Sequence, residues 1–113
     1  MLPKCADMPS PLIPNEPKKC VDMTEVRAGV DAIDTALIGL LARRFSYMDA
    51  AARIKPSRSD VRDEGRKAQV IGNVKAAAAT KGVPVHLVAA LWDLIVEASI
   101  AHELEQWDAA NSA

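Results

Sequence analysis

Two basic side chains occupy positions where apolar side chains are expected on a long amphipathic stretch. The apolar positions that lead to Leu37 and Leu40 continue, in steps of three and four, through Arg44 and on to Lys55. Eleven residues at about 100° each bring Arg44 and Lys55 to within about 20° of each other around a helix. The two cations therefore either reach solvent from the ends of the stripe or act together at a local site.

Arg27 is a third cation of the same stretch and faces another direction. It precedes Arg44 by 17 residues, which places it about 100° away around the axis of one straight helix. Within one chain it cannot face the point that Arg44 faces. If Arg27 joins the same site, a neighbouring subunit must supply it.

The last amphipathic stretch carries a hydroxyl and a carboxylate on an otherwise apolar face. Ser99 and Glu103 lie four residues apart on that face. Glu103 is either a residue of a site or an exposed side chain near a fraying helix end. Asp63 and Arg66 leave a similar choice, because an Asp–Arg pair at this spacing is commonly a surface pair.

Amphipathic helices must position these side chains. Asp22 followed by Glu25 has the offset of a capping box, and a helical apolar pattern then runs without interruption to Pro56. We predict one helix of about 30 residues over this stretch. Its apolar stripe consists of Val26, Val30, Ile33, Leu37, Leu40 and Leu41.

Two further helices follow a short polar connection at residues 56–59. Asp60 is the predicted N-cap of a helix from Val61 to Lys81, and Gly82 ends that helix. Pro84 suits the first turn of a third helix. The third helix is predicted to bury Leu87, Val88, Leu91, Leu94, Ile95 and Ala98. Strand-like alternation is absent from the sequence, so the predicted fold class is all-α with three helices.

The length of the first helix bears on assembly. A helix of 30 residues is about 45 Å long, whereas a compact chain of this size has a radius of gyration of only about 13 Å. The helix overhangs its own domain, and its apolar stripe continues along the overhang. We therefore predict an intertwined helical homodimer.

Residues 1–21 differ in composition from the rest of the chain. They hold five of the seven prolines and lack hydrophobic periodicity, which predicts a flexible leader before one domain at residues 22–113. Cys5 and Cys20 are too few ligands for a zinc site. They are interpreted as free thiols, the alternative being a disulfide in an exported protein.

The overall charge and hydropathy exclude several classes of partner. The chain has 113 residues and a formal net charge of −1, so it lacks the field that attracts nucleic acid, and its basic residues must act locally. We expect neither a membrane span nor a signal peptide, because apolar runs of the necessary length are missing. A soluble, cytoplasmic protein is the expectation.

Residues 24–108 resemble the all-helical class of chorismate mutases and their relatives, the isochorismate-pyruvate lyases. The family's first helix is similar to Val26-Arg27, Ile33-Asp34, the Leu-Leu-Ala-Arg-Arg run at residues 40–44, and Lys55. The second helix resembles the family in Val61-Arg62-Asp63 followed by Arg66. The third does so in the Leu-Trp-Asp-Leu-Ile-Val-Glu-Ala-Ser run at residues 91–99. The resemblance implies the same three-helix intertwined dimer.

The resemblance also implies a reaction and a role for each polar residue. Chorismate rearranges to prephenate in one unimolecular step without a cofactor or metal, so catalysis requires positioning and fixed charge. Arg44, with Arg27 from the partner, would bind the substrate carboxylates, and Arg66 would add positive potential. Lys55 and Glu103 would donate hydrogen bonds to the ether oxygen. Ser99 would bind the ring carboxylate, and Asp63 would lie near the ring hydroxyl.

Two positions depart from the family pattern. Glu103 stands where many members have Gln, and a carboxylate donates a hydrogen bond only when it is protonated. Lys67 stands directly after the arginine of the second helix, where a Glu commonly contacts the ring hydroxyl.

These departures leave an isochorismate-pyruvate lyase as the alternative activity. Residues 43–57 and the short loop from Lys55 to Arg66 resemble the lyase, whereas residues 61–63, Ser99 and the third helix resemble the mutase. A non-catalytic helical dimer is a third possibility. Six matching polar positions argue against it, because a scaffold has no reason to keep cations on a buried seam.

Overall fold

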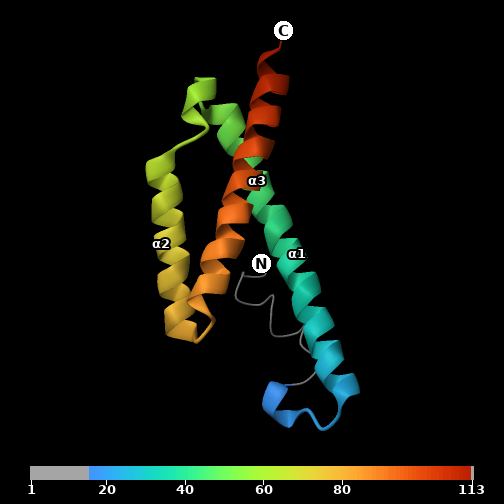
Figure 1. The fold of residues 1–113 in the computed structure, drawn as a ribbon. Helices are drawn as coiled ribbons and strands as arrows, with labels where there is room; N and C mark the ends of the chain where they lie inside the picture. The colour runs from blue at the N-terminus through green and yellow to red at the C-terminus, as the bar shows by residue number, and fades with distance from the viewer. Residues whose placement is uncertain (1–15, 113) are drawn as a thin grey trace, which may run out of the picture. The chain divides into compact units, whose positions relative to one another are not determined.

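The computed structural model describes residues 16–112. The elements in chain order are a 3-10 helix η3 (Pro17–Lys19), α1 (Met23–Ile54), a second 3-10 helix η4 (Arg58–Asp60), α2 (Glu64–Lys81) and α3 (Val85–Asn111) (Figure 1). Residues 16–112 contain three α-helices and no strand. The predicted all-α class is confirmed.

The chain divides into two compact units, Met1–Arg44 and Phe45–Ala113, and the division falls within α1. In the first unit, the Asp22 Oδ1 accepts a hydrogen bond from the Glu25 N–H at 2.9 Å, and the Glu25 Oε1 accepts one from the Val21 N–H at 3.0 Å. These bonds satisfy donors that a helix start leaves unpaired. The capping signal at Asp22 therefore marks the start of α1, as predicted.

The predicted leader lies mostly outside the described residues, which begin at Glu16. Cys5 is among the residues not described. Within residues 16–21, η3 is closed by the Lys19 N–H, which donates to the Glu16 carbonyl at 2.9 Å. The Cys20 thiol donates to the same carbonyl at 3.6 Å.

The apolar stripe of α1 is exposed in the single chain. Between 38 and 52% of the surface is accessible at Val26, Val30, Ile33, Leu37 and Leu40. Burial of such a stripe is the usual source of stability for a long helix. A stable α1 therefore requires a cover for this face.

In the second unit, α2 begins later than predicted. The predicted N-cap Asp60 instead accepts a hydrogen bond from the Ser57 N–H at 3.2 Å and closes η4 in a capping box. Val61, with 3% exposure, enters the apolar core, and Asp63 caps α2 through the Arg66 N–H at 2.9 Å. The prediction of a helix from Val61 was wrong, because Val61 is an anchor between two helical segments.

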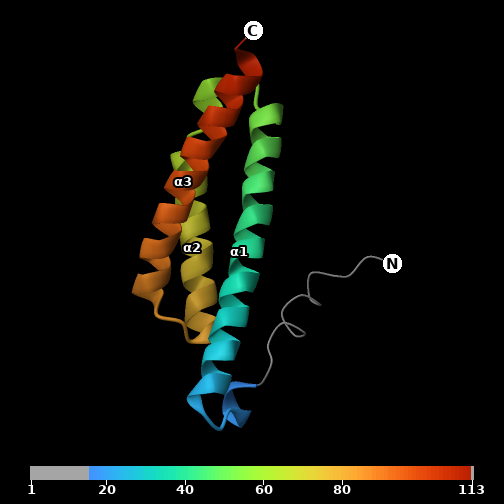
Figure 2. The same ribbon diagram turned by 90° about the vertical axis from the view of Figure 1, so that its right-hand side faces the viewer.

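The end of α2 is as predicted. Gly82 has a φ of 73°, and its N–H donates to the carbonyls of the last helical turn. This left-handed conformation is readily available only to glycine. The turn leads directly to α3, so that α2 and α3 lie side by side (Figures 1 and 2).

The buried face of α3 differs in part from the predicted one. Val88 is buried as predicted, but Leu87, Leu91 and Leu94 are 44 to 69% exposed. The other buried residues of α3 lie outside the predicted stripe and are Val96, Ser99, Ile100 and Glu103. The core cluster consists of Val61, Val96 and Ile100, with Val70, Trp92, Leu104 and Trp107 packed against it.

α3 is the helix in the described part of the chain that is long and apolar enough to cross a membrane, with a mean hydropathy of 1.4 over 18 residues. By composition alone, the expectation that no segment has this property was wrong. The same helix carries a buried carboxylate at Glu103 and several ion pairs to α2 and to the segment before it. Such charged side chains are costly in lipid, and they favour packing within a helical protein.

Two cations join the start of α2 to α3. The Arg62 guanidinium donates to both Glu97 oxygens, at 2.7 and 3.1 Å, and the Lys67 ammonium lies 2.8 Å from Glu97 and 2.9 Å from Asp93. Hydrogen bonds from Arg62 and then from Lys67 lower the pKa of the Glu97 carboxyl from its ordinary 4.5 to about 2. Glu97 is thus the shared anion of this contact.

We expect Glu97 to stabilise the fold in a pH-dependent way. Its pKa is lower in the folded chain, so its contribution is complete above about pH 4.5 and disappears as the pH falls towards 2. Thermal unfolding midpoints of the wild type and Glu97→Gln should differ at pH 7 and converge between pH 4.5 and 2. Glu105→Gln, an exposed change on the same helix, is the control. A difference that stays constant over this range would contradict the assignment.

Candidate active site

Lys55 and Glu103 meet in the second unit although 48 positions separate them in the sequence. Lys55 follows the last residue of α1, and its N–H still donates to the Ala51 carbonyl at 2.9 Å. Its ammonium Nζ lies 2.7 Å from the Glu103 Oε2. The end of α1 therefore places a cation beside the C-terminal half of α3.

The surroundings of the two charges differ. Glu103 is 3% exposed, whereas the Lys55 side chain is 30% exposed. The Glu103 Oε2 has no well-directed hydrogen bond from any described residue, despite its proximity to Lys55. A buried carboxylate oxygen without such a bond is costly, so this oxygen would gain from a new hydrogen-bonding partner.

Two neighbours on α3 flank Glu103, one turn away on either side. Ser99 is 3% exposed, and its hydroxyl donates to the Ile95 carbonyl at 2.7 Å. Trp107 donates its indole N–H to the Lys55 carbonyl at 3.1 Å. The face that sequence analysis found anomalous is therefore buried, and the alternative of an exposed, fraying Glu103 is wrong.

Asp63 and Arg66 lie at the start of α2. The Asp63 Oδ1 accepts the cap hydrogen bond from the Arg66 N–H, and the Arg66 guanidinium donates to the Gln69 Oε1 at 2.6 Å. Both side chains are exposed. Asp63 thus has a structural role that the Asp–Arg spacing alone did not predict.

Arg27 and Arg44 belong to the first unit, where Arg27 is exposed and Arg44 half-buried. The meeting of these arginines with Lys55 and Glu103 stays a prediction.

Sequence reasoning missed several contacts of the second unit. Lys67, considered only as a departure from a family pattern, is held by Asp93 and Glu97. These two carboxylates stand four residues apart on α3, a spacing that could have indicated a face needing a cation. The His102 Nε2 lies 2.6 Å from the Asp49 Oδ1, a pairing across more than 50 positions that has no local sequence signal.

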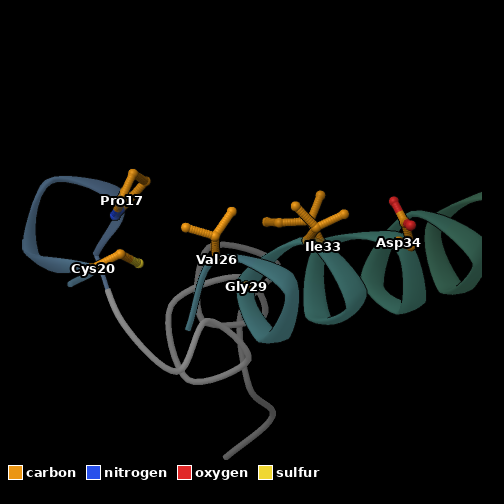
Figure 3. Close-up of a pocket in the computed structure, with 7 residues that line it drawn as sticks. Pro17, Cys20, Val26, Gly29, Ile33 and Asp34 are labelled. Carbon is orange, nitrogen blue, oxygen red and sulfur yellow. The ribbon is translucent and has the colours of Figure 1, made fainter. Parts of the chain in front are cut away.

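A pocket of about 300 Å³ lies in the first unit between η3 and the first turns of α1. Figure 3 shows Val26, Ile33 and Asp34 projecting from α1 towards the same side, with Pro17 and Cys20 on the 3-10 turn. The lining is mainly apolar and includes no Lys or Arg. It therefore lacks the cations that a substrate with two carboxylates requires.

Comparison with known families identifies the fold and its chemistry. The family model described as chorismate mutase type II matches residues 26–104. The chain belongs to the chorismate mutase type II family. The matched range contains all seven polar residues selected from the sequence: Arg27, Arg44, Lys55, Asp63, Arg66, Ser99 and Glu103.

Chorismate mutases are isomerases that convert chorismate to prephenate, and they are typically soluble enzymes. The family match supports this activity, and the isochorismate-pyruvate lyase alternative is not favoured. A search among curated proteins gave no match. Among residues 16–112, no group of three His, Cys, Asp or Glu side chains is placed to hold a metal ion.

We expect the Lys55–Glu103 pair to contribute to the free energy of unfolding. Lys55→Met should leave a buried carboxylate without its cation and lower the free energy of unfolding by about 1–3 kcal/mol. Combining it with Glu103→Gln should recover part of that loss, giving a coupling of about 1–2 kcal/mol in urea denaturation.

The matched control is the Arg58–Asp108 pair, at 2.8 Å with both side chains at least half exposed. Its coupling, from Arg58→Met and Asp108→Asn, should be under about 1 kcal/mol. Additive effects of the Lys55 and Glu103 changes would show that the two charges do not stabilise each other.

Proposed function

We propose that the chain rearranges chorismate to prephenate at a site centred on Lys55 and Glu103. The observation that carries this proposal is a buried carboxylate beside an ammonium group, with one oxygen lacking a well-directed hydrogen bond. A fold maintained for stability alone gains little from such a pair, because burying the Glu103 carboxylate costs about as much as its attraction to Lys55 returns. The pair is better explained by a ligand that uses it.

The reaction explains why these two groups stand together. When the ether C–O bond breaks, negative charge develops on its oxygen, and donors already fixed in place stabilise that charge. The Lys55 ammonium is one such donor. Glu103 is the second, in its protonated form, because an ionised carboxylate accepts hydrogen bonds and repels the developing charge. The active state is therefore the one in which Glu103 carries a proton.

The remaining polar residues would bind the substrate. Arg44, Arg66 and a partner's Arg27 provide the positive charge that two carboxylates require. Ser99 would donate to the ring carboxylate by exchanging its bond to the Ile95 carbonyl. Asp63 would accept from the ring hydroxyl through the carboxylate that also caps α2. Together these contacts would hold the folded, reactive conformer of the substrate.

We propose that the enzyme is a homodimer with Arg27 contributed in trans. Two observations support a second copy as the cover: the exposed stripe of α1 and the exposed face of α3 that includes Leu87, Leu91 and Leu94. Apolar faces of this extent on a small chain are typical of subunit interfaces. The pocket beside η3 opens on the stripe of α1 and would be closed by the same partner.

The proposed setting is the cytoplasm, in aromatic amino-acid biosynthesis, with residues 22–113 as the catalytic domain. A net charge of −1 gives no general attraction for nucleic acid or an anionic membrane surface. The proposed partners are chorismate and the second copy.

Incubating the purified protein with chorismate and with isochorismate, and identifying the products, tests the reaction. We expect prephenate from chorismate. Glu103→Gln supplies a permanent amide donor and should keep or raise the rate at pH 7. Glu103→Ala and Lys55→Ala should each lower kcat by about 100-fold, by analogy with the loss of one oxyanion donor.

Glu105→Ala, on the exposed side of α3, is the control and should leave kcat unchanged. Salicylate and pyruvate from isochorismate, without prephenate, would identify a lyase instead. Absence of both activities would favour the non-catalytic dimer.

Mixing two inactive variants tests the dimer. Arg27→Ala and Arg44→Ala should each be nearly inactive, but a heterodimer of the two rebuilds one intact site from the unchanged arginines. Random pairing after co-refolding should restore about a quarter of the wild-type activity, since half of the dimers are mixed and half of their sites are intact. Each variant refolded alone is the control. No recovery in proven heterodimers would place Arg27 outside the partner's site.

A further inference from the structure

Trp107 holds the backbone of the residue that the proposed mechanism places beside the breaking bond. Its indole N–H donates to the Lys55 carbonyl at 3.1 Å. Its ring is half-buried and packs against the apolar cluster of Val61, Val96 and Ile100. The donor is therefore fixed by the core of the second unit.

The Lys55 carbonyl requires a partner because it lies at the end of a helix. The last carbonyls of a helix accept no hydrogen bond from an N–H of the same helix. The helix cannot continue here, because Pro56 lacks an N–H and disfavours a helical conformation at Lys55. The Trp107 indole supplies the missing donor. This bond fixes the orientation of the peptide unit between Lys55 and Pro56. That unit is attached to the Lys55 Cα, from which the side chain projects.

Lys55 is thereby held at two points by one face of α3. Glu103 contacts the ammonium Nζ at 2.7 Å, and Trp107, one turn later, bonds the backbone carbonyl. The long, flexible lysine side chain has many rotamers, so a contact at its tip alone leaves the stem free. Fixing both ends restricts the ammonium group to one position.

The neighbouring ion pair contributes less to this arrangement. Arg58 and Asp108 form two hydrogen bonds, at 2.8 and 3.2 Å, between η4 and the last turns of α3. Their side chains are 56 and 50% exposed, and exposed pairs of this kind are weak. The indole bond is the half-buried contact that acts on Lys55 directly.

We propose that Trp107 is a positioning residue for Lys55, which keeps the ammonium group where charge develops in the transition state. This inference rests on the proposed role of Lys55 as a donor to the ether oxygen. A donor displaced from that point contributes little to the rate even though it remains charged.

Trp107→Phe removes the N–H and keeps an aromatic ring in the core. We expect kcat to fall about tenfold, with KM within about twofold of the wild type, because the loss affects a contact made in the transition state. Trp92→Phe is the matched control, since Trp92 packs against the same cluster fifteen residues earlier on α3. It should change kcat by less than twofold.

The decisive comparison uses a background without Lys55. If Trp107 acts through Lys55, Trp107→Phe should have no further effect on kcat in a Lys55→Ala protein. A tenfold loss that persists there would overturn the proposal and indicate a general structural role. Equal losses in Trp107→Phe and Trp92→Phe would overturn it as well.

A second measurement does not depend on activity. The stability coupling between Lys55→Met and Glu103→Gln should fall by at least half in a Trp107→Phe background, because a loosened Lys55 no longer stays beside Glu103. An unchanged coupling would overturn the positioning role. If the wild type forms no prephenate but the coupling is lost in the Trp107→Phe background, the proposed function is contradicted. The positioning of Lys55 by Trp107 is then still supported.

Discussion

The second unit is organised around one electrostatic constraint: a carboxylate lies within the protein and must be neutralised there. Glu103 is 3% exposed, and an isolated charge at such a depth is far costlier than any single hydrophobic contact can offset. Lys55, at the end of α1, supplies the neutralising cation. Trp107 donates a hydrogen bond to the Lys55 carbonyl, which would otherwise lack a donor at the end of the helix. The end of α1 is thus held against α3 by polar groups that each have few other partners. These contacts fix the register between the two helices, because apolar contacts alone would tolerate several packing arrangements.

Much of the fold could be predicted because its signals are local. The cap at Asp22 and the left-handed glycine at Gly82 act within a few residues of themselves. The start of α2 could not be predicted in this way, since Asp60 and Asp63 are both competent caps. The choice depends on Val61, which is drawn into a core built from distant residues. The buried face of α3 had the same difficulty, because that helix is apolar on more than one side and only its neighbours determine which side is covered.

Part of the candidate site could be predicted, because a charged residue within an apolar stripe is easily recognised in a sequence. Such an anomaly indicated Lys55 and Glu103, and the structure places them in contact. The partners of Lys67 escaped detection because a surface lysine has no distinctive pattern until a second helix brings carboxylates to it. Trp107 escaped for another reason: its acceptor is a backbone carbonyl, which every residue has and no sequence pattern marks. Contacts between a side chain and a distant backbone carbonyl can be found only in the three-dimensional structure.

The tight turn at Gly82 has a consequence for the order in which the protein assembles. Because residues 82–84 alone separate α2 from α3, the contacts between these helices close short loops and form quickly. The end of α1 must instead close a loop of nearly 50 residues to reach Glu103. We expect the α2–α3 hairpin to form early and to keep the Glu103 carboxylate hydrated until Lys55 arrives. Water would then leave this region only in the last folding step, so that the Lys55–Glu103 pair and the finished tertiary structure would appear together.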